Sequence, residues 1–225
     1  MIPHDAFKEI REELEKRPLL VNHYRDVAGE GRSQTFGIVN RRCLPYDYSR
    51  QNWVRPKLYH HLQEFARKYV DISYTSITVN QNYRCLPHRD KNNQGDSFLV
   101  AFGSYAGGNL VMHEGDLSGS HDIWCTPIKA DFSKVLHSVE PFTGTRYSLV
   151  FYTLKATKQP EQPLPPGQVI FEDGKYWFKR GDKIILPKTG LDHPRRGWKT
   201  KTKKEEKVGS MTVIESQENF VVSFQ

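Results

Sequence analysis

Residues 134–153 read KVLHSVEPFTGTRYSLVFYT, a stretch rich in the β-branched and aromatic residues that favour strands. Similar short runs follow Asp71, namely ISYTSITVNQNY, SFLVAFG, GNLVMHE and DIWCTPI, separated by Gly, Asn, Asp and Pro. Short strands at this spacing are typical of an antiparallel sandwich or barrel. We therefore expect a mainly β fold with its core at about residues 72–154.

Two helices are expected before these strands. Residues 5–16 carry apolar side chains on one face of a helix, with Asp5 placed to cap it and Pro18 placed to end it. From Pro56, apolar residues recur at helical spacing, which predicts a helix lying on a sheet. We assign the two histidines of this second helix, His60 and His61, to the surface or to packing.

A metal site is indicated by residues 85–93, CLPHRDKNN, where His88 and Asp90 lie one residue apart at the end of a strand-like run. Side chains at this spacing point to the same side of an extended backbone, so both can reach one ion. His137, within the strand-rich stretch quoted first, supplies a second imidazole. Two histidines and one carboxylate, with the other metal positions open, are the arrangement used for Fe(II) oxygen chemistry. The alternative is a turn that Asp90 caps, with His88 on the surface.

Arg146 follows His137 on the next expected strand. A planar guanidinium can hold a carboxylate through two parallel charge-assisted hydrogen bonds, and the open metal positions accept a bidentate 2-oxo acid and then dioxygen. A structural salt bridge is the alternative for Arg146. Neither His113 nor His121 has a carboxylate at a spacing that completes a metal site, so we assign His113 to the pocket lining and His121 to the surface.

The order HxD, His, Arg within antiparallel strands resembles the 2-oxoglutarate- and Fe(II)-dependent dioxygenase superfamily, over residues 72–154. The resemblance implies a double-stranded β-helix (a jelly roll, or cupin-like core) and oxidation of a substrate C–H bond, coupled to decarboxylation of 2-oxoglutarate to succinate. It makes iron ligands of His88, Asp90 and His137, and it makes Arg146 the residue that holds 2-oxoglutarate. The implied cofactors are Fe(II), 2-oxoglutarate and dioxygen.

Residues 80–115 most resemble the TET/JBP-type nucleobase hydroxylases, through Asn80 and Asn82 before the HxD motif, the turn after it and the double glycine further on. This implies oxidation of the 5-methyl group of a pyrimidine in DNA, either 5-methylcytosine or thymine. We assign Asn82 to co-substrate binding and leave Tyr83 open between the pocket and packing. The alternatives are an AlkB-like N-demethylase, a protein or small-molecule hydroxylase, which the short interval from His137 to Arg146 permits, and a silent binding module.

Charge favours a polyanionic partner. Lys and Arg outnumber Asp and Glu by 33 to 26, giving +7 and a pI near 9.2, so nucleic acid, DNA above all, is the expected partner. A solvated lysine-rich tail is the alternative. No apolar run approaches the roughly 20 residues that span a bilayer. Because the cysteines form no CxxC pair, we expect an intracellular protein, in the nucleus or cytoplasm; the sequence does not indicate an oligomeric state.

The chain divides into two expected parts: residues 1–157, the dioxygenase domain, and residues 158–225, a small β appendage with a basic extension. In the second part a Pro-rich bridge precedes two strand-like runs around Asp173-Gly174, which predicts a tight hairpin. Aromatic residues alternate there with Lys and Arg, as in nucleic-acid grooves, although a small hairpin core is the alternative. These aromatic residues are Tyr176, Trp177, Phe178 and Trp198.

Overall fold

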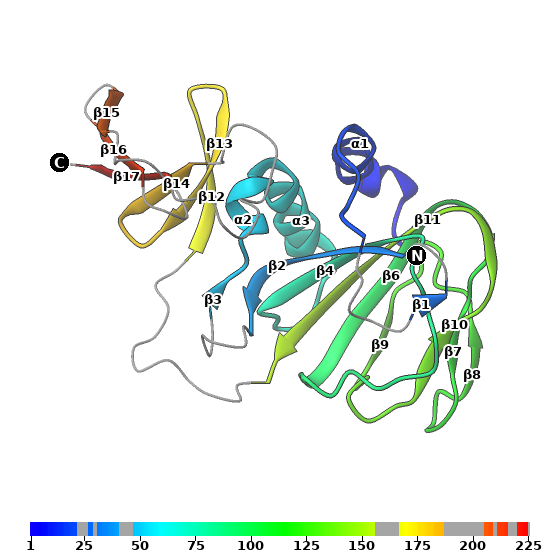
Figure 1. The fold of residues 1–225 in the computed structure, drawn as a ribbon. Coiled ribbons are helices and arrows are strands. Elements are labelled where there is room, and N and C mark those ends of the chain that lie inside the picture. The colour runs from blue at the N-terminus through cyan, green and yellow to red at the C-terminus, as the bar shows by residue number, and fades with distance from the viewer. Residues whose placement is uncertain are drawn as a thin grey trace.

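The computed structural model describes residues 1–21, 27–28, 31–40, 47–155, 167–186, 205–208, 211–215 and 220–224. Its main body consists of a large and a small antiparallel sheet, with the helices on one side of the large sheet (Figure 1). The prediction of a mainly β fold with flanking helices is confirmed. Within the described residues, no helix is both long and apolar enough to cross a bilayer.

The large sheet has six strands, all paired antiparallel. Its order is β3 (Asp47–Tyr48), β2 (Arg32–Val39), β4 (Ser76–Gln81), β11 (Phe142–Leu154), β6 (Asn93–Gly107) and β9 (Ile128–Ala130). Side chains alternate along the central strand β11, because successive residues of a strand face opposite sides. Tyr147, Leu149 and Phe151 pack into the core beneath the helices, so the residues between them face the opposite side of the sheet.

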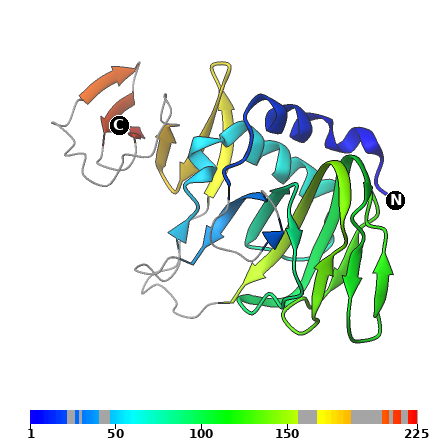
Figure 2. The same cartoon turned by 45° about the vertical axis from the view of Figure 1, so that its right-hand side comes forward.

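The helices cover the first face of the large sheet (Figure 2). They are a 3-10 turn η1 (His4–Phe7), α1 (Lys8–Lys16), α2 (Gln51–Val54) and α3 (Pro56–Tyr69). The second helix begins at Pro56, as predicted. The first differs from the prediction: it opens as a 3-10 turn, and no side chain, that of Asp5 included, caps either η1 or α1. Burial of Phe7, Ile10 and Leu14 holds it on the sheet instead.

The small sheet has the order β10 (His137–Val139), β7 (Leu110–Met112) and β8 (Gly119–His121). It packs against β6 and β9 through a second apolar cluster, made of Leu99, Ala101, Leu110, Met112, Ile123, Ala130, Phe132 and Val139. This cluster includes no residue of β2 or β4, so the small sheet lies over the β6 and β9 half of the large one.

Two predicted strands are shorter in the structure. The run through Tyr83 ends at Gln81, because Asn82 takes a left-handed conformation with φ 49°. A two-stranded ladder of β1 (Val27–Ala28) and β5 (Arg84–Cys85) follows that turn. The run DIWCTPI forms only a bridge between Trp124 and Ala101 before β9 begins, since Cys125 also has a positive φ of 51°. Strand β2 was not predicted.

The predicted hairpin is confirmed. Strands β12 (Gly167–Glu172) and β13 (Lys175–Arg180) pair antiparallel across Asp173 and Gly174, whose φ angles of 50° and 73° suit a two-residue hairpin turn. The sheet continues through β14 (Lys183–Leu186), β17 (Phe220–Phe224), β16 (Met211–Glu215) and β15 (Glu205–Val208). The predicted boundary after residue 157, Cys43 and Trp198 lie outside the described residues.

The hairpin belongs to the core of the main body. Phe178 is fully buried, with its ring 5.4 Å from that of Tyr48 and 5.8 Å from that of Trp53. Tyr176 packs on His60 and His61 of α3, which gives those histidines the packing role expected of them. Phe178 is therefore a packing residue, and stacking on bases falls to other side chains if it occurs.

Candidate metal centre and co-substrate cavity

The three predicted metal ligands come together. His88, Asp90 and His137 each offer a ligand atom, and these atoms lie within 4.8 Å of one another. The Nε2 atom of His88 is 3.5 Å from Oδ1 of Asp90, so the HxD spacing does bring both side chains to one side. His137 comes from β10 and joins the HxD segment through an isolated antiparallel bridge to His88.

Backbone carbonyls orient both imidazoles. Nδ1 of His88 is 2.8 Å from the carbonyl oxygen of Leu86, and Nδ1 of His137 is 3.0 Å from that of Val135. Each ring nitrogen that donates to a carbonyl carries the proton, which leaves the Nε2 lone pair available to a metal. The Nδ2 amide of Asn93 donates to Oδ2 of Asp90 at 3.2 Å and fixes the carboxylate in turn.

The electrostatics of the three side chains favour a cation. The carboxylate of Asp90 raises the pKa of His88 to about 10, because a positive charge on the ring is stabilised by its neighbour. Burial lowers the pKa of His137, so that ring is neutral. A divalent ion bound here would take the place of the proton that Asp90 otherwise attracts to His88.

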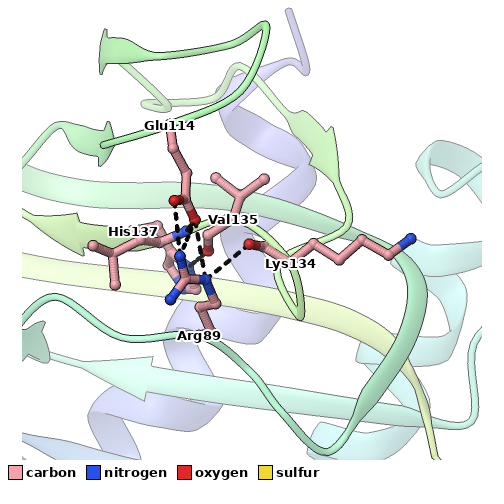
Figure 3. Close-up of polar contacts among 6 residues, drawn as sticks. Arg89, Glu114, Lys134, Val135 and His137 are labelled. Carbon is pink, nitrogen blue, oxygen red and sulfur yellow. Dashed lines mark hydrogen bonds and ion pairs between the residues drawn. The ribbon is translucent and has the colours of Figure 1, made fainter.

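An ion pair that the sequence analysis missed holds the two ligand segments together (Figure 3). Arg89, between the first two ligands, donates from Nε and Nη2 to the carboxylate of Glu114 at 2.5 to 3.0 Å and from Nε to the carbonyl of Lys134 at 2.9 Å. Glu114 accepts the N–H of Leu136 at 2.6 Å. Leu136 precedes His137, so the Arg89–Glu114 pair connects the HxD segment to the third ligand.

One cavity reaches from the metal ligands to Arg146. Its described lining also contains Thr78, Asn80, Tyr83, Cys85, Asn93, Leu99, Leu110, Phe132, Val139, Ser148, Val150 and Tyr152. Four of these positions alternate along β11, from Arg146 through Ser148 and Val150 to Tyr152, and this alternation is a signal present in the sequence RYSLVFY. The cavity therefore lies between the two sheets, on the face of the large sheet opposite the helices.

Arg146 is held in place without a counter-ion. It is 2% exposed, its Nε donates to the carbonyl of Gly108 at 3.2 Å, and its guanidinium carbon lies 5.5 Å and 5.8 Å from the ring centres of Tyr105 and Phe142. Its Nη2 is buried without a hydrogen-bond partner, and no described carboxylate pairs with it. Burial lowers the pKa of Arg146, a cost that an anion in the cavity would offset.

Asn82 has a different place from the one assigned to it. Its Oδ1 accepts the backbone N–H of Arg146 at 2.9 Å and its own N–H donates to the Arg146 carbonyl at 2.8 Å. It is absent from the described cavity lining, whereas Tyr83 is part of it. Asn82 thus positions the strand segment that carries Arg146. His113 is also absent from that lining and contacts the hydroxyl of Ser138, and His121 is half-buried.

Comparison with solved structures identifies the fold. The structure described as NgTET1 in complex with 5mC DNA matches with a TM-score of 0.50 and 16% identity, over 70% of each chain. That fold is a double-stranded β-helix. The expected architecture is therefore confirmed, with the large and small sheets as its two sides.

Two further matches are less similar. A 2OG-Fe(II) oxygenase family oxidoreductase from Burkholderia pseudomallei has a TM-score of 0.44 and 13% identity, over 63% of this chain and 76% of that one. A Pseudomonas putida prolyl-4-hydroxylase has a TM-score of 0.43 and 13% identity, over 68% and 89%. Neither protein-family models nor curated proteins give a match to the chain.

Proposed function

We propose that this chain is a non-haem Fe(II) dioxygenase that uses 2-oxoglutarate. One observation carries the proposal: the metal-ligand set and the buried, unpaired guanidinium of Arg146 open into the same cavity. The two imidazoles and one carboxylate fit Fe(II), because they are its usual facial ligand set and leave other positions for small molecules. The partnerless Nη2 of Arg146 fits the distal carboxylate of a dicarboxylic 2-oxo acid.

Each residue then has a definite task. When bound, the iron supplies the activation of dioxygen that oxidises a C–H bond while 2-oxoglutarate loses carbon dioxide. His88, Asp90 and His137 hold the ion, and the carbonyls of Leu86 and Val135 keep Nε2 of each imidazole deprotonated. Arg146 binds the far carboxylate of the co-substrate, where the flanking rings of Tyr105 and Phe142 exclude water and strengthen the charged contact.

For the substrate, we propose the 5-methyl group of a pyrimidine base in DNA. Two observations support this choice: the chain carries a net charge of +7, which suits a polyanion, and NgTET1, which has the same fold, has been solved with 5mC DNA. A base within a duplex must leave the stack before a methyl group can reach a metal inside a cavity. Binding to duplex DNA would therefore include extrusion of the target base.

The test is a product assay. The protein is incubated with Fe(II), 2-oxoglutarate and separate panels of oligodeoxynucleotides containing 5-methylcytosine, thymine or N-methylated bases, together with methylated RNA and peptides. We expect succinate and a 5-methyl base heavier by one oxygen atom, detected by mass spectrometry, and neither product with Asp90→Ala. Loss of an N-methyl group would select the demethylase alternative, and an oxidised peptide would select the protein hydroxylase.

A further inference from the structure

The cavity face of the large sheet carries an uncharged polar surface. Cross-strand partners in an antiparallel pair face the same side. The register pairs Thr35 with Thr78 and Thr78 with Val150, so these residues share the face that carries Arg146. By the same register and alternation, the polar face consists of Ser33 and Thr35 on β2, Thr78 and Asn80 on β4, and Ser148 and Tyr152 on β11.

Hydrogen bonds within the polar face leave capacity for a ligand. The hydroxyl of Thr78 lies 3.0 Å from that of Thr35 and 3.4 Å from that of Tyr152. Each hydroxyl has one donor and two acceptor sites, so this chain does not use them all. The Nδ2 amide of Asn80 donates to Ser148 at 3.2 Å, while its Oδ1 is buried with no partner. In this orientation of the amide, Asn80 presents an acceptor that 2-oxoglutarate, which has no donor when ionised, does not satisfy.

The cavity is also longer than the co-substrate. From Arg146 to Tyr152 the strand runs six residues, roughly 20 Å at about 3.4 Å per residue. The four C–C bonds of 2-oxoglutarate, at about 1.5 Å each, span only roughly 5 Å. A co-substrate held at Arg146 therefore lies beside Ser148 and Val150, and the end of the cavity at Thr78 and Tyr152 remains for another molecule.

We infer that this end of the polar face, formed by Thr78, Tyr152 and Asn80, is the substrate subsite and that it receives a neutral, hydrogen-bonding group such as a pyrimidine base. The inference rests on the proposed function and specifies its substrate class. The charged residues of the described cavity lining are the metal ligands and Arg146, all of which are already engaged. A charged substrate group would find no counter-ion at the polar face, whereas a base can bond to both hydroxyls and the amide.

The experiment removes single hydroxyls while keeping the shape of the side chain. In Thr78→Val and Tyr152→Phe we expect affinity for a 5-methylcytosine oligonucleotide to fall about threefold to tenfold for each hydrogen bond lost. Binding is measured by fluorescence anisotropy on metal-free full-length protein at one fixed salt concentration, and KM is measured with Fe(II) and 2-oxoglutarate present. The matched control is Thr143→Val, an exposed threonine of β11 outside the described cavity lining, and it should bind like the unaltered protein.

Three results would overturn the inference: unchanged oligonucleotide affinity and KM in both variants, loss of 2-oxoglutarate affinity in place of oligonucleotide affinity, or no oligonucleotide binding by the unaltered protein. Failure of the proposed function is recognised separately, as an absence of Fe(II)-dependent succinate formation in the unaltered protein. The anisotropy measurement still tests the polar face in that case, because it requires no turnover.

Discussion

His88 and His137 donate their backbone N–H groups to each other's carbonyl oxygens, at 3.0 Å in both directions. Two of the three proposed metal ligands are thus brought together by main-chain bonds, independently of any ion. Asp90 is tied in the same way, since its N–H donates to the carbonyl of Phe132 at 2.9 Å. The site is therefore organised by the fold before a metal arrives, and loss of one ligand side chain leaves these bonds in place.

The first prediction follows from this arrangement. His88→Ala and Asp90→Ala should abolish Fe(II) binding and turnover and leave the β fold intact, because the backbone bonds at both positions remain. Calorimetric titration with metal and circular dichroism measure the two effects separately. Full activity of Asp90→Ala would refute the assignment of the metal site.

A second prediction concerns Arg146. Arg146→Ala should raise the KM for 2-oxoglutarate about tenfold to a hundredfold, since a charge-assisted hydrogen bond contributes about 1.5 to 3 kcal/mol. Arg146→Lys should restore part of the affinity, because it keeps the charge and loses the two-pronged geometry. Metal affinity in the absence of co-substrate serves as the control. An unchanged KM would mean that another residue holds the co-substrate.

The Arg89–Glu114 pair gives a third prediction. Glu114→Ala removes the acceptor of both Arg89 and the Leu136 N–H, so the His137 segment loses its connection to the HxD segment. Metal affinity should fall about tenfold, at the lower end of the effects of residues that support metal ligands. The matched control is Lys129→Ala, which breaks another exposed ion pair, that with Asp71 at 2.7 Å. Equal metal affinities in the two variants would show that the Arg89–Glu114 pair has no positioning role.

Local patterns were sufficient to predict the proposed metal ligands. The spacing of His88 and Asp90 determines that both side chains share one side of an extended chain, and Arg146 lies on a strand whose alternation is visible in the sequence. The hairpin at Asp173-Gly174 was predicted for the same reason, because its turn chemistry is contained in two adjacent residues.

Features that depend on register between distant segments were not predicted. Arg89 and Glu114 are 25 positions apart and meet only because β7 and β10 pair beside the HxD segment. The polar face requires the alignment of β2, β4 and β11, and β2 itself was missed. Asn82 was assigned to the co-substrate because its left-handed turn, which directs the side chain to the Arg146 backbone, is not apparent from the sequence.

A fourth prediction distinguishes packing from base stacking in the hairpin. Phe178→Ala should destabilise the protein by about 3 to 5 kcal/mol, the usual cost of truncating a fully buried phenylalanine. Phe171→Ala, at a side chain 61% exposed on the neighbouring strand, should change stability little. Urea unfolding measures both variants. Equal stability would mean that the hairpin does not contribute to the core of the main body.

The last prediction concerns the polyanionic partner. If the positive charge serves DNA, affinity should fall steeply with salt, because each neutralised phosphate releases condensed counterions and contributes about −0.9 to the slope of log K against log salt. A chain ending at residue 191 lacks the basic stretch HPRRGWKTKTKK, so its slope should be shallower and its KM for oligonucleotide higher. Its 2-oxoglutarate decarboxylation without substrate should persist, because the described metal ligands and Arg146 all precede residue 155. Affinity is measured by anisotropy from low to physiological salt for both chains. A slope that is zero, or equal in the two chains, would argue against DNA binding by this stretch and favour a protein or small-molecule substrate.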